Sequence, residues 1–172
     1  MTVALEPGDL APDFLLPNLE GKLARFYDRF SGNAVVLYFC ASNGGAEGEM
    51  ELRGLAERRD QFDAAEGRVV VVTQDSHEAN AAFISRLGLD LDLFSDPVGA
   101  ITNGYCGAPA EAWPGDGNRA SIFVLDPNQR IAAAFHGGTQ HAQGALDGLM
   151  DLRRRLAPGP DPRPAPILVL PN

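Results

Sequence analysis

Two short apolar runs separated by an amphipathic helical pattern constrain the fold of this chain more than any other feature. The runs are AVVLYFC at residues 34–40 and RVVVVTQ at residues 68–74. Continuous apolar runs rich in branched and aromatic residues are typical of strands that are covered on both faces. Between them, apolar residues recur at helical spacing from Met50 to Phe62. This order predicts two parallel strands joined by a crossover helix.

The second half of the chain extends this pattern. Ser76 is expected to cap a helix that ends at Gly88. Two further strands, at residues 121–125 and 130–135, flank the turn sequence DPNQ, whose proline suits a tight hairpin. A last helix is expected at residues 139–156. The sequence therefore predicts an α/β, thioredoxin-like fold, with a mixed central sheet and helices on both faces.

Composition changes after residue 156, because six of the 13 prolines lie between residues 158 and 171. We therefore expect one domain over residues 1–156 and a proline-rich linker or tail over residues 157–172. The apolar ILVL at residues 167–170 either docks on this domain as an edge strand or leads into a second domain.

Charge and hydropathy exclude several functions. The net charge of -9 would repel nucleic acid and anionic lipid, so neither is expected as a partner. No apolar run is long enough to span a bilayer and no export signal is visible, so the expected location is the cytoplasm.

The sequence shows no nucleotide or metal site. The glycines beside Asn43 lack the lysine of a phosphate loop, and His136 and His141 are predicted to be solvated loop residues. No cofactor or metal is expected.

Several motifs in this order resemble the peroxiredoxins of the alkyl hydroperoxide reductase and thiol-specific antioxidant type. They are PGDLAPDFLLPNLEGKLARF at the front, VVLYF in the first apolar run, LFSDPVGAITNGYCG, and the hairpin SIFVLDPNQRI. The resemblance covers about residues 8–156. It implies a redox fold whose reactive cysteine lies in a Pro-x-x-x-Thr-x-x-Cys sequence, where a helix N-terminus and an arginine lower the thiol pKa.

The signature itself is missing from this chain. Counting along the sequence places Cys40 at the proline, Gly44 at the threonine and Glu47 at the cysteine. A carboxylate cannot be oxidised to a sulfenic acid, so the usual peroxidase cycle is unavailable at Glu47. The resemblance also implies an arginine, for which Arg119 is the candidate although it lies one residue out of register. If Arg119 points inward it can pair with Glu47, and with Gly44 these residues are the candidate binding site.

The two cysteines are the candidate catalytic residues. Cys40 ends an apolar run and is predicted to be a buried core residue. Cys106 follows Tyr105 in a glycine-flanked segment and is expected to be the more accessible thiol. A disulfide between them requires Cα atoms within about 7 Å.

Two functions follow as hypotheses. The main one is a peroxiredoxin-like domain without peroxidase activity, which serves as a binding or docking module for another enzyme. The chain also resembles the redoxin-like region that precedes 2-oxoglutarate and Fe(II)-dependent oxygenase domains, so a fused or partner oxygenase is one expectation and a homodimer another. The alternative is a divergent thiol-dependent oxidoreductase that uses Cys40, Cys106 or both.

Overall fold

A five-stranded mixed sheet forms the centre of the molecule. The computed structural model describes residues 4–30, 32–40, 46–107, 120–136 and 141–156. The strand order is β5-β4-β3-β6-β7, in which the first three strands are parallel and the last two are antiparallel to their neighbours. The strands are β3 (Ala34–Cys40), β4 (Gly67–Thr73), β5 (Asp92–Ser95), β6 (Ala120–Leu125) and β7 (Ile131–His136). The predicted α/β fold with a mixed sheet is confirmed.

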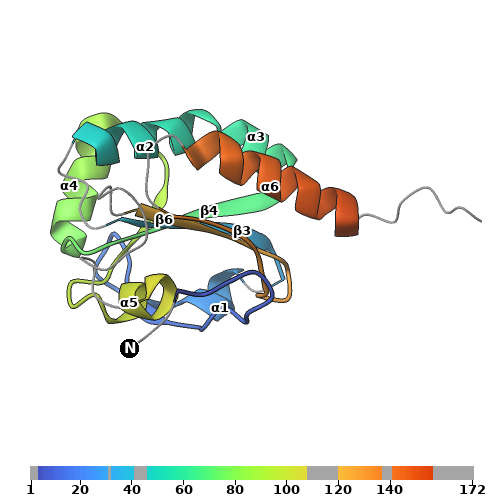
Figure 1. Ribbon diagram of the computed structural model, residues 1–172. Coiled ribbons are helices and arrows are strands. Elements are labelled where there is room, and N and C mark those ends of the chain that lie inside the picture. Colours follow the sequence, from blue (N-terminus) through green and yellow to red (C-terminus); the bar gives the residue numbers. More distant parts are fainter. Residues whose placement is uncertain (1–3, 31, 41–45, 108–119, 137–140, 157–172) are drawn as a thin grey trace, which may run out of the picture.

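Helices cover both faces of this sheet, as Figure 1 shows. One face carries α2 (Ala46–Glu57), α3 (Arg59–Ala64), α4 (His77–Leu87) and α6 (His141–Leu156). The other carries α1 (Phe26–Phe30), α5 (Ala100–Cys106) and the small hairpin of β1 (Leu15–Pro17) and β2 (Leu23–Arg25). None of the helices within the described ranges is long and apolar enough to cross a membrane.

Every residue of β3 is buried, as its apolar sequence predicts. Successive side chains alternate between the two faces. Val36, Tyr38 and Cys40 pack into the core under α2 and α6. Phe39 and its alternate neighbours pack into the second core, under α1 and α5. This alternation decides on which side of the sheet each candidate side chain lies.

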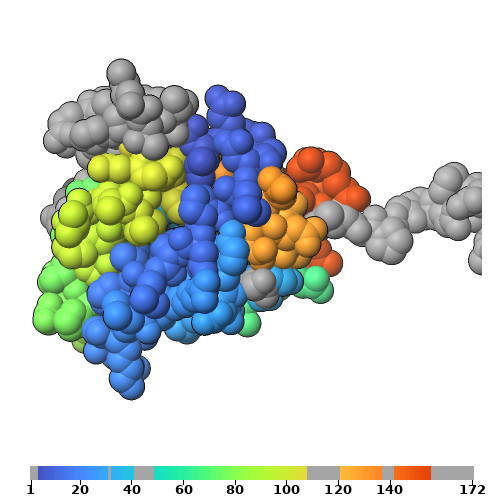
Figure 2. Space-filling view, turned by 90° about the horizontal axis from the view of Figure 1, so that it is seen from below, coloured from blue at the N-terminus to red at the C-terminus, as the bar shows by residue number. Residues whose placement is uncertain are grey.

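The N-terminal segment runs across the face that carries α5. Figure 2 shows this segment in blue between α5 in yellow and the β6–β7 hairpin in orange. Backbone hydrogen bonds fix it at both sides: Leu5 N–H donates to the Tyr105 carbonyl at 2.9 Å, and Gly8 N–H donates to the Ile131 carbonyl at 2.8 Å. This N-terminal segment therefore covers the second core.

The helix break near Arg58 differs from the sequence-based expectation of one helix. Arg58 has φ -95° and ψ 8°, and α3 begins at the next residue. Its guanidinium donates to the Gly54 carbonyl at 3.2 Å, the same carbonyl that its own N–H reaches at 3.3 Å. The Arg58 side chain thus competes with the Arg58 backbone N–H for the Gly54 carbonyl. The helical spacing of apolar residues does not reveal this contact.

The caps of α4 are those that the sequence predicts. Ser76 Oγ accepts a hydrogen bond from Ala79 N–H at 3.1 Å, and Gly88 ends the helix at φ 64°, where an L side chain is disfavoured.

Ser76→Ala should lower the free energy of unfolding by about 1 kcal/mol, because a helix donor loses its acceptor. Urea unfolding followed by circular dichroism measures this loss. Ser76→Asp keeps an acceptor at the cap and should remain close to the parent. An equal loss in both variants would contradict capping as the cause.

Candidate functional site

The carboxyl ends of the parallel strands define one edge of the sheet, which is where ligands bind in open α/β sheets. Cys40 ends β3 at this edge, and α2 begins beyond it. The antiparallel strands bring further side chains to the same edge, because Phe39 lies opposite Ser121, which lies opposite His136. Residues that are distant in sequence therefore meet here.

Glu47 lies in the first turn of α2. Its side chain lies outside the described part of the structure, as do Gly44 and Arg119 in full. The Glu47–Arg119 pair thus stays a prediction. The absence of a cysteine from the start of α2 does not depend on the alignment, since no residue between 41 and 105 is a cysteine.

Cys40 is a buried core residue, as predicted. It is 3% exposed and packs on the α2 side of the sheet. Burial, with the negative charge of Asp75, raises the pKa of its thiol far above the ordinary value. At neutral pH this thiol is protonated and held inside the core.

The expectation that Cys106 is accessible is wrong. It is 1% exposed, because the last turn of α5 lies on the sheet and turns Tyr105 and Cys106 inward together. Burial raises the pKa of the Cys106 thiol to about 12, a hydrogen bond with Ser121 lowers it, and the charge of Asp96 raises it. The glycines on either side of Tyr105 and Cys106 in the sequence do not indicate that Cys106 is buried.

The sheet separates the two cysteines. Cys40 belongs to the core under α2, whereas Cys106 belongs to the core under α5. Neither takes part in a disulfide. Since β3 and its neighbours lie between the thiols, this conformation does not contain the dithiol pair that the sequence left open.

Cys106, Ser121 and His136 form a row on the α5 side of the sheet. Ser121 is fully buried, its side chain lowers the pKa of the Cys106 thiol, and its Oγ lies 2.9 Å from Nδ1 of His136. The His136 ring packs edge-on against Phe123, with centroids 5.6 Å apart. His136 is thus the half-buried last residue of β7, which corrects the prediction of a solvated loop histidine. His141 begins α6, and its side chain lies outside the described residues.

The spacing of residues in the sequence does not reveal this row, because a bulge sets the register of the hairpin. Ser121 and His136 are cross-strand partners, but a bulge between Val124 and Leu125 shifts the pairing by one residue. Counting from the DPNQ turn without that bulge would place His136 on the wrong neighbour. The sequence pairs Ser121 with His136 only when this bulge is included in the count.

A buried carboxylate fixes α5 to the end of β5. Asp96 accepts hydrogen bonds from the backbone N–H of Thr102 at 2.8 Å and from its hydroxyl at 2.7 Å. Both residues are buried. These bonds hold the helix that carries Cys106 in a fixed position on the sheet.

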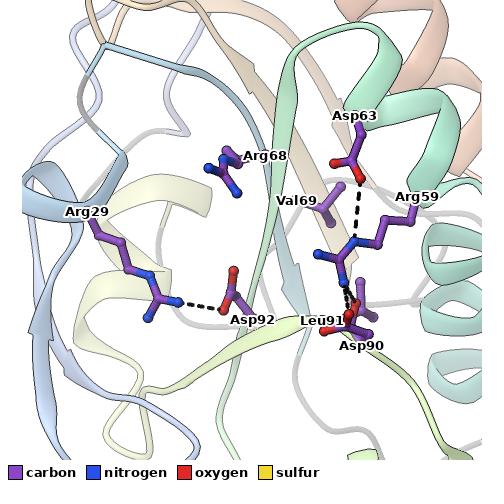
Figure 3. Close-up of a pocket in the computed structure, with 8 residues that line it drawn as sticks. All are labelled: Arg29, Arg59, Asp63, Arg68, Val69, Asp90, Leu91 and Asp92. Atoms are coloured by element: carbon purple, nitrogen blue, oxygen red, sulfur yellow. Dashed lines mark hydrogen bonds and ion pairs between the residues drawn. The ribbon is translucent and has the colours of Figure 1, made fainter.

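A polar hollow of about 250 Å³ lies at the opposite edge of the sheet, near the starts of β4 and β5. Figure 3 shows its charged side chains, with Arg29 paired to Asp92 at 3.1 Å and Arg59 paired to Asp90 and, at 3.7 Å, to Asp63. With Arg68 the lining holds three positive and three negative groups. Because these charges cancel, the hollow offers no net attraction to a charged ligand. Within the ranges that the structure covers, no three His, Cys, Asp or Glu side chains are grouped to hold a metal ion.

Known proteins agree with the fold. A protein of Mycobacterium tuberculosis named among the peroxiredoxins is 28% identical over 159 residues, which is 91% of this chain and 98% of its own. Peroxidoxin BcpB of the same organism superposes with a TM-score of 0.73 at 22% identity, over 87% of this chain and 97% of that one. The bacterioferritin comigratory protein of Xanthomonas campestris gives 0.71 at 19% identity, over 88% and 98%.

These structural matches establish a thioredoxin-fold architecture of the peroxiredoxin kind. The family model described as AhpC/TSA matches residues 7–134, which is most of the chain and includes the edge where β3 meets α2. The chain belongs to the AhpC/TSA family.

Proposed function

We propose that this protein is a thiol-dependent oxidoreductase of the antioxidant type, which reduces a hydroperoxide with Cys106 as its reactive thiol. The observation that carries the proposal is that buried Cys106 has its thiol pKa lowered by Ser121, whose Oγ lies 2.9 Å from Nδ1 of His136. Membership of the AhpC/TSA family supports the reaction class. The Xanthomonas relative is described by its alkyl peroxide reduction activity, which favours an alkyl hydroperoxide as the substrate.

The reaction needs a sulfur nucleophile. A cysteine thiol attacks the outer peroxide oxygen, the O–O bond breaks, and the products are a cysteine sulfenic acid and an alcohol. Two equivalents of an external thiol then return the sulfenic acid to the thiol, with release of water and a disulfide. Because α2 contains no cysteine, this chemistry falls to Cys40 or Cys106. Cys106 is the better candidate, since Ser121 lowers the pKa of its thiol.

Access to Cys106 requires a local opening. The N-terminal segment covers the end of α5, where Leu5 N–H donates to the Tyr105 carbonyl next to Cys106. Chain ends open at a lower free-energy cost than the core. Displacement of this segment would expose the end of α5 and leave the hydrogen bond between Ser121 and His136 in place. We therefore expect slow turnover.

Peroxide consumption tests the proposal. The parent protein, Cys40→Ser and Cys106→Ser are each supplied with cumene hydroperoxide and dithiothreitol. Cys40→Ser should keep the activity, whereas Cys106→Ser should fall by at least about 100-fold, to the background rate. Mass spectrometry after dimedone trapping should find the sulfenic acid at Cys106. Activity that survives in Cys106→Ser, or a parent without activity, would refute the proposal.

A second candidate is the binding or docking module without peroxidase activity. Its supporting observation is that α2 lacks cysteine while burial raises the pKa of both thiols. It predicts that the folded parent consumes no peroxide. The partner, whether a fused oxygenase, a separate protein or a second copy, then remains to be found. Light scattering tests for the second copy, and the gene sequence beyond Asn172 tests for a fused domain.

A further inference from the structure

We propose that the N-terminal strap, residues 5–12, is a gate that opens as one unit and controls access to Cys106. Two tyrosine hydroxyls from the body of the domain hold it closed, and its hinge lies just before Asp13. The gate deepens the function proposed above and rests on it for the role of Cys106, but its opening is measured without peroxide.

The strap covers the end of α5. Figure 2 shows it between α5 and the β6–β7 hairpin. Tyr105 and Cys106, the last two residues of α5, are each 1% exposed. Leu5 N–H donates to the carbonyl of Tyr105 at 2.9 Å, so the strap bonds directly to the residue before the thiol. The strap therefore lies between solvent and this end of α5.

Hydrogen bonds rather than buried apolar surface hold the strap. Residues 6–10 are exposed, and Leu10 is 50% exposed although it is apolar. Ala11 is the one fully buried residue of the strap. Since burial of apolar surface provides most of the folding free energy, a segment that buries so little opens at a lower free-energy cost than the core. Opening of the strap therefore precedes unfolding of the sheet.

The strap pairs in antiparallel fashion with the start of β7 and the turn before it. Gly8 N–H donates to the Ile131 carbonyl at 2.8 Å, and Ile131 N–H donates back to the Asp9 carbonyl at 2.9 Å. Ala11 N–H donates to the Gln129 carbonyl at 2.8 Å. Neighbouring bonds of such a ladder form and break together, so we expect the strap to open as one unit rather than residue by residue.

Two tyrosine hydroxyls hold the end of the strap that lies next to the hinge. The Tyr105 hydroxyl donates to the Pro12 carbonyl, and the Tyr27 hydroxyl donates to the Ala11 carbonyl. Tyr105 thus holds the strap at both ends, through its carbonyl at Leu5 and through its hydroxyl at Pro12. Because the thiol belongs to the next residue of the same helical turn, release of the strap and exposure of the thiol go together.

The chain is anchored from Asp13 onward. The Asp13 carboxylate accepts hydrogen bonds from the N–H groups of Phe14 at 2.9 Å and Tyr27 at 2.8 Å. It also accepts one from the Arg25 guanidinium at 2.6 Å. The buried Phe14 ring stacks on Phe26, with centroids 4.6 Å apart. None of these contacts involves the strap, so they remain when it leaves, and the hinge lies just before Asp13.

Alkylation of the two native thiols tests the gate in the full chain. Iodoacetamide is added to the folded protein at pH 8 with low concentrations of urea, and peptide mass spectrometry gives separate rates for Cys106 and Cys40. Cys40 lies on the other face of the sheet, which the strap does not reach. In the parent, Cys106 should react at least about 10-fold faster than Cys40 and with a shallower dependence on urea, because the opened strap exposes less surface than unfolding does.

Removal of a single strap contact should speed this reaction. Tyr105→Phe and Tyr27→Phe keep the ring and lose the hydroxyl, and each should raise the Cys106 rate by about 2–10-fold, the effect of one hydrogen bond. Leu5→Pro removes the N–H that reaches Tyr105 and should act likewise, whereas Leu5→Ala keeps it and should have a smaller effect. Tyr38→Phe is the matched control, because this tyrosine packs in the core on the other face. It should leave the Cys106 rate at the parent value.

The readouts distinguish the gate from the proposed function. If the three strap variants Tyr105→Phe, Tyr27→Phe and Leu5→Pro speed alkylation of Cys106 but the parent consumes no cumene hydroperoxide, the gate stands and the peroxidase function falls. If Cys106 consumes peroxide but these variants leave its alkylation rate unchanged, the function stands and the gate falls. Equal rates and equal urea dependence for both thiols would mean that unfolding exposes them, which also overturns the gate. Circular dichroism of each variant excludes misfolding as the cause of a faster rate.

Discussion

Raising the pH above 9 should unfold this protein, with the free energy of unfolding falling by about 8 kcal/mol between pH 9 and 11. The cause is a set of four buried acids whose pKa values burial raises, namely Cys40, Cys106, Tyr38 and Tyr105. In the unfolded chain the thiols ionise from about pH 9 and the phenols from about pH 10. The folded state keeps all four protonated.

The sign follows from proton binding. Above pH 9 the unfolded chain binds fewer protons than the native state, so rising pH favours unfolding. Each ionised group adds a slope of about 1.4 kcal/mol per pH unit. The free energy of unfolding therefore falls by about 3 kcal/mol between pH 9 and 10, and by about 5 kcal/mol between pH 10 and 11, where the phenols also ionise. The contribution is fully present below pH 9. A total loss of about 8 kcal/mol is comparable with the whole stability of a typical domain.

Urea unfolding at a series of pH values, followed by circular dichroism, measures this slope. The matched control is the double variant Cys40→Ala with Cys106→Ala, which should lose the decline between pH 9 and 10 and keep the decline above pH 10. If the parent stays equally stable from pH 8 to 11, the buried thiols and phenols ionise in the native state and the described burial is wrong.

Local sequence signals predicted those parts of the fold that depend on neighbouring residues. The continuous apolar run of β3 gave its exact bounds, and Ser76 and Gly88 gave the ends of α4. The tight turn after β6 is also local, because the Asp126 carboxylate accepts hydrogen bonds from the N–H groups of Asn128 and Arg130. Such features form wherever these residues occur, so the sequence suffices to find them.

The candidate site depends on long-range packing, which the sequence does not display. The burial of Cys106 requires α5 to lie on Phe39 and Phe123, and the pairing of His136 with Ser121 requires a bulge between Val124 and Leu125. By contrast, the absence of a cysteine from α2 is plain in the sequence and sets this chain apart from the signature of the family it belongs to. Together these facts move the candidate chemistry from the head of α2 to the row beneath α5.

Phe123→Ala should lower the free energy of unfolding by about 3–5 kcal/mol, the usual cost of deleting a buried ring. Its fully buried ring contacts the rings of Tyr105 at 5.7 Å and His136 at 5.6 Å, so the cavity would lie directly between the sheet and α5. Phe135→Ala is the matched control, because this half-buried ring lies on the adjacent strand and packs on the opposite face. Urea unfolding at pH 7.5 should show a clearly smaller loss for the control. Loosening α5 should also speed the reaction of native Cys106 with Ellman's reagent in Phe123→Ala alone, and equal effects of both variants on stability and thiol reactivity would contradict this account of the site.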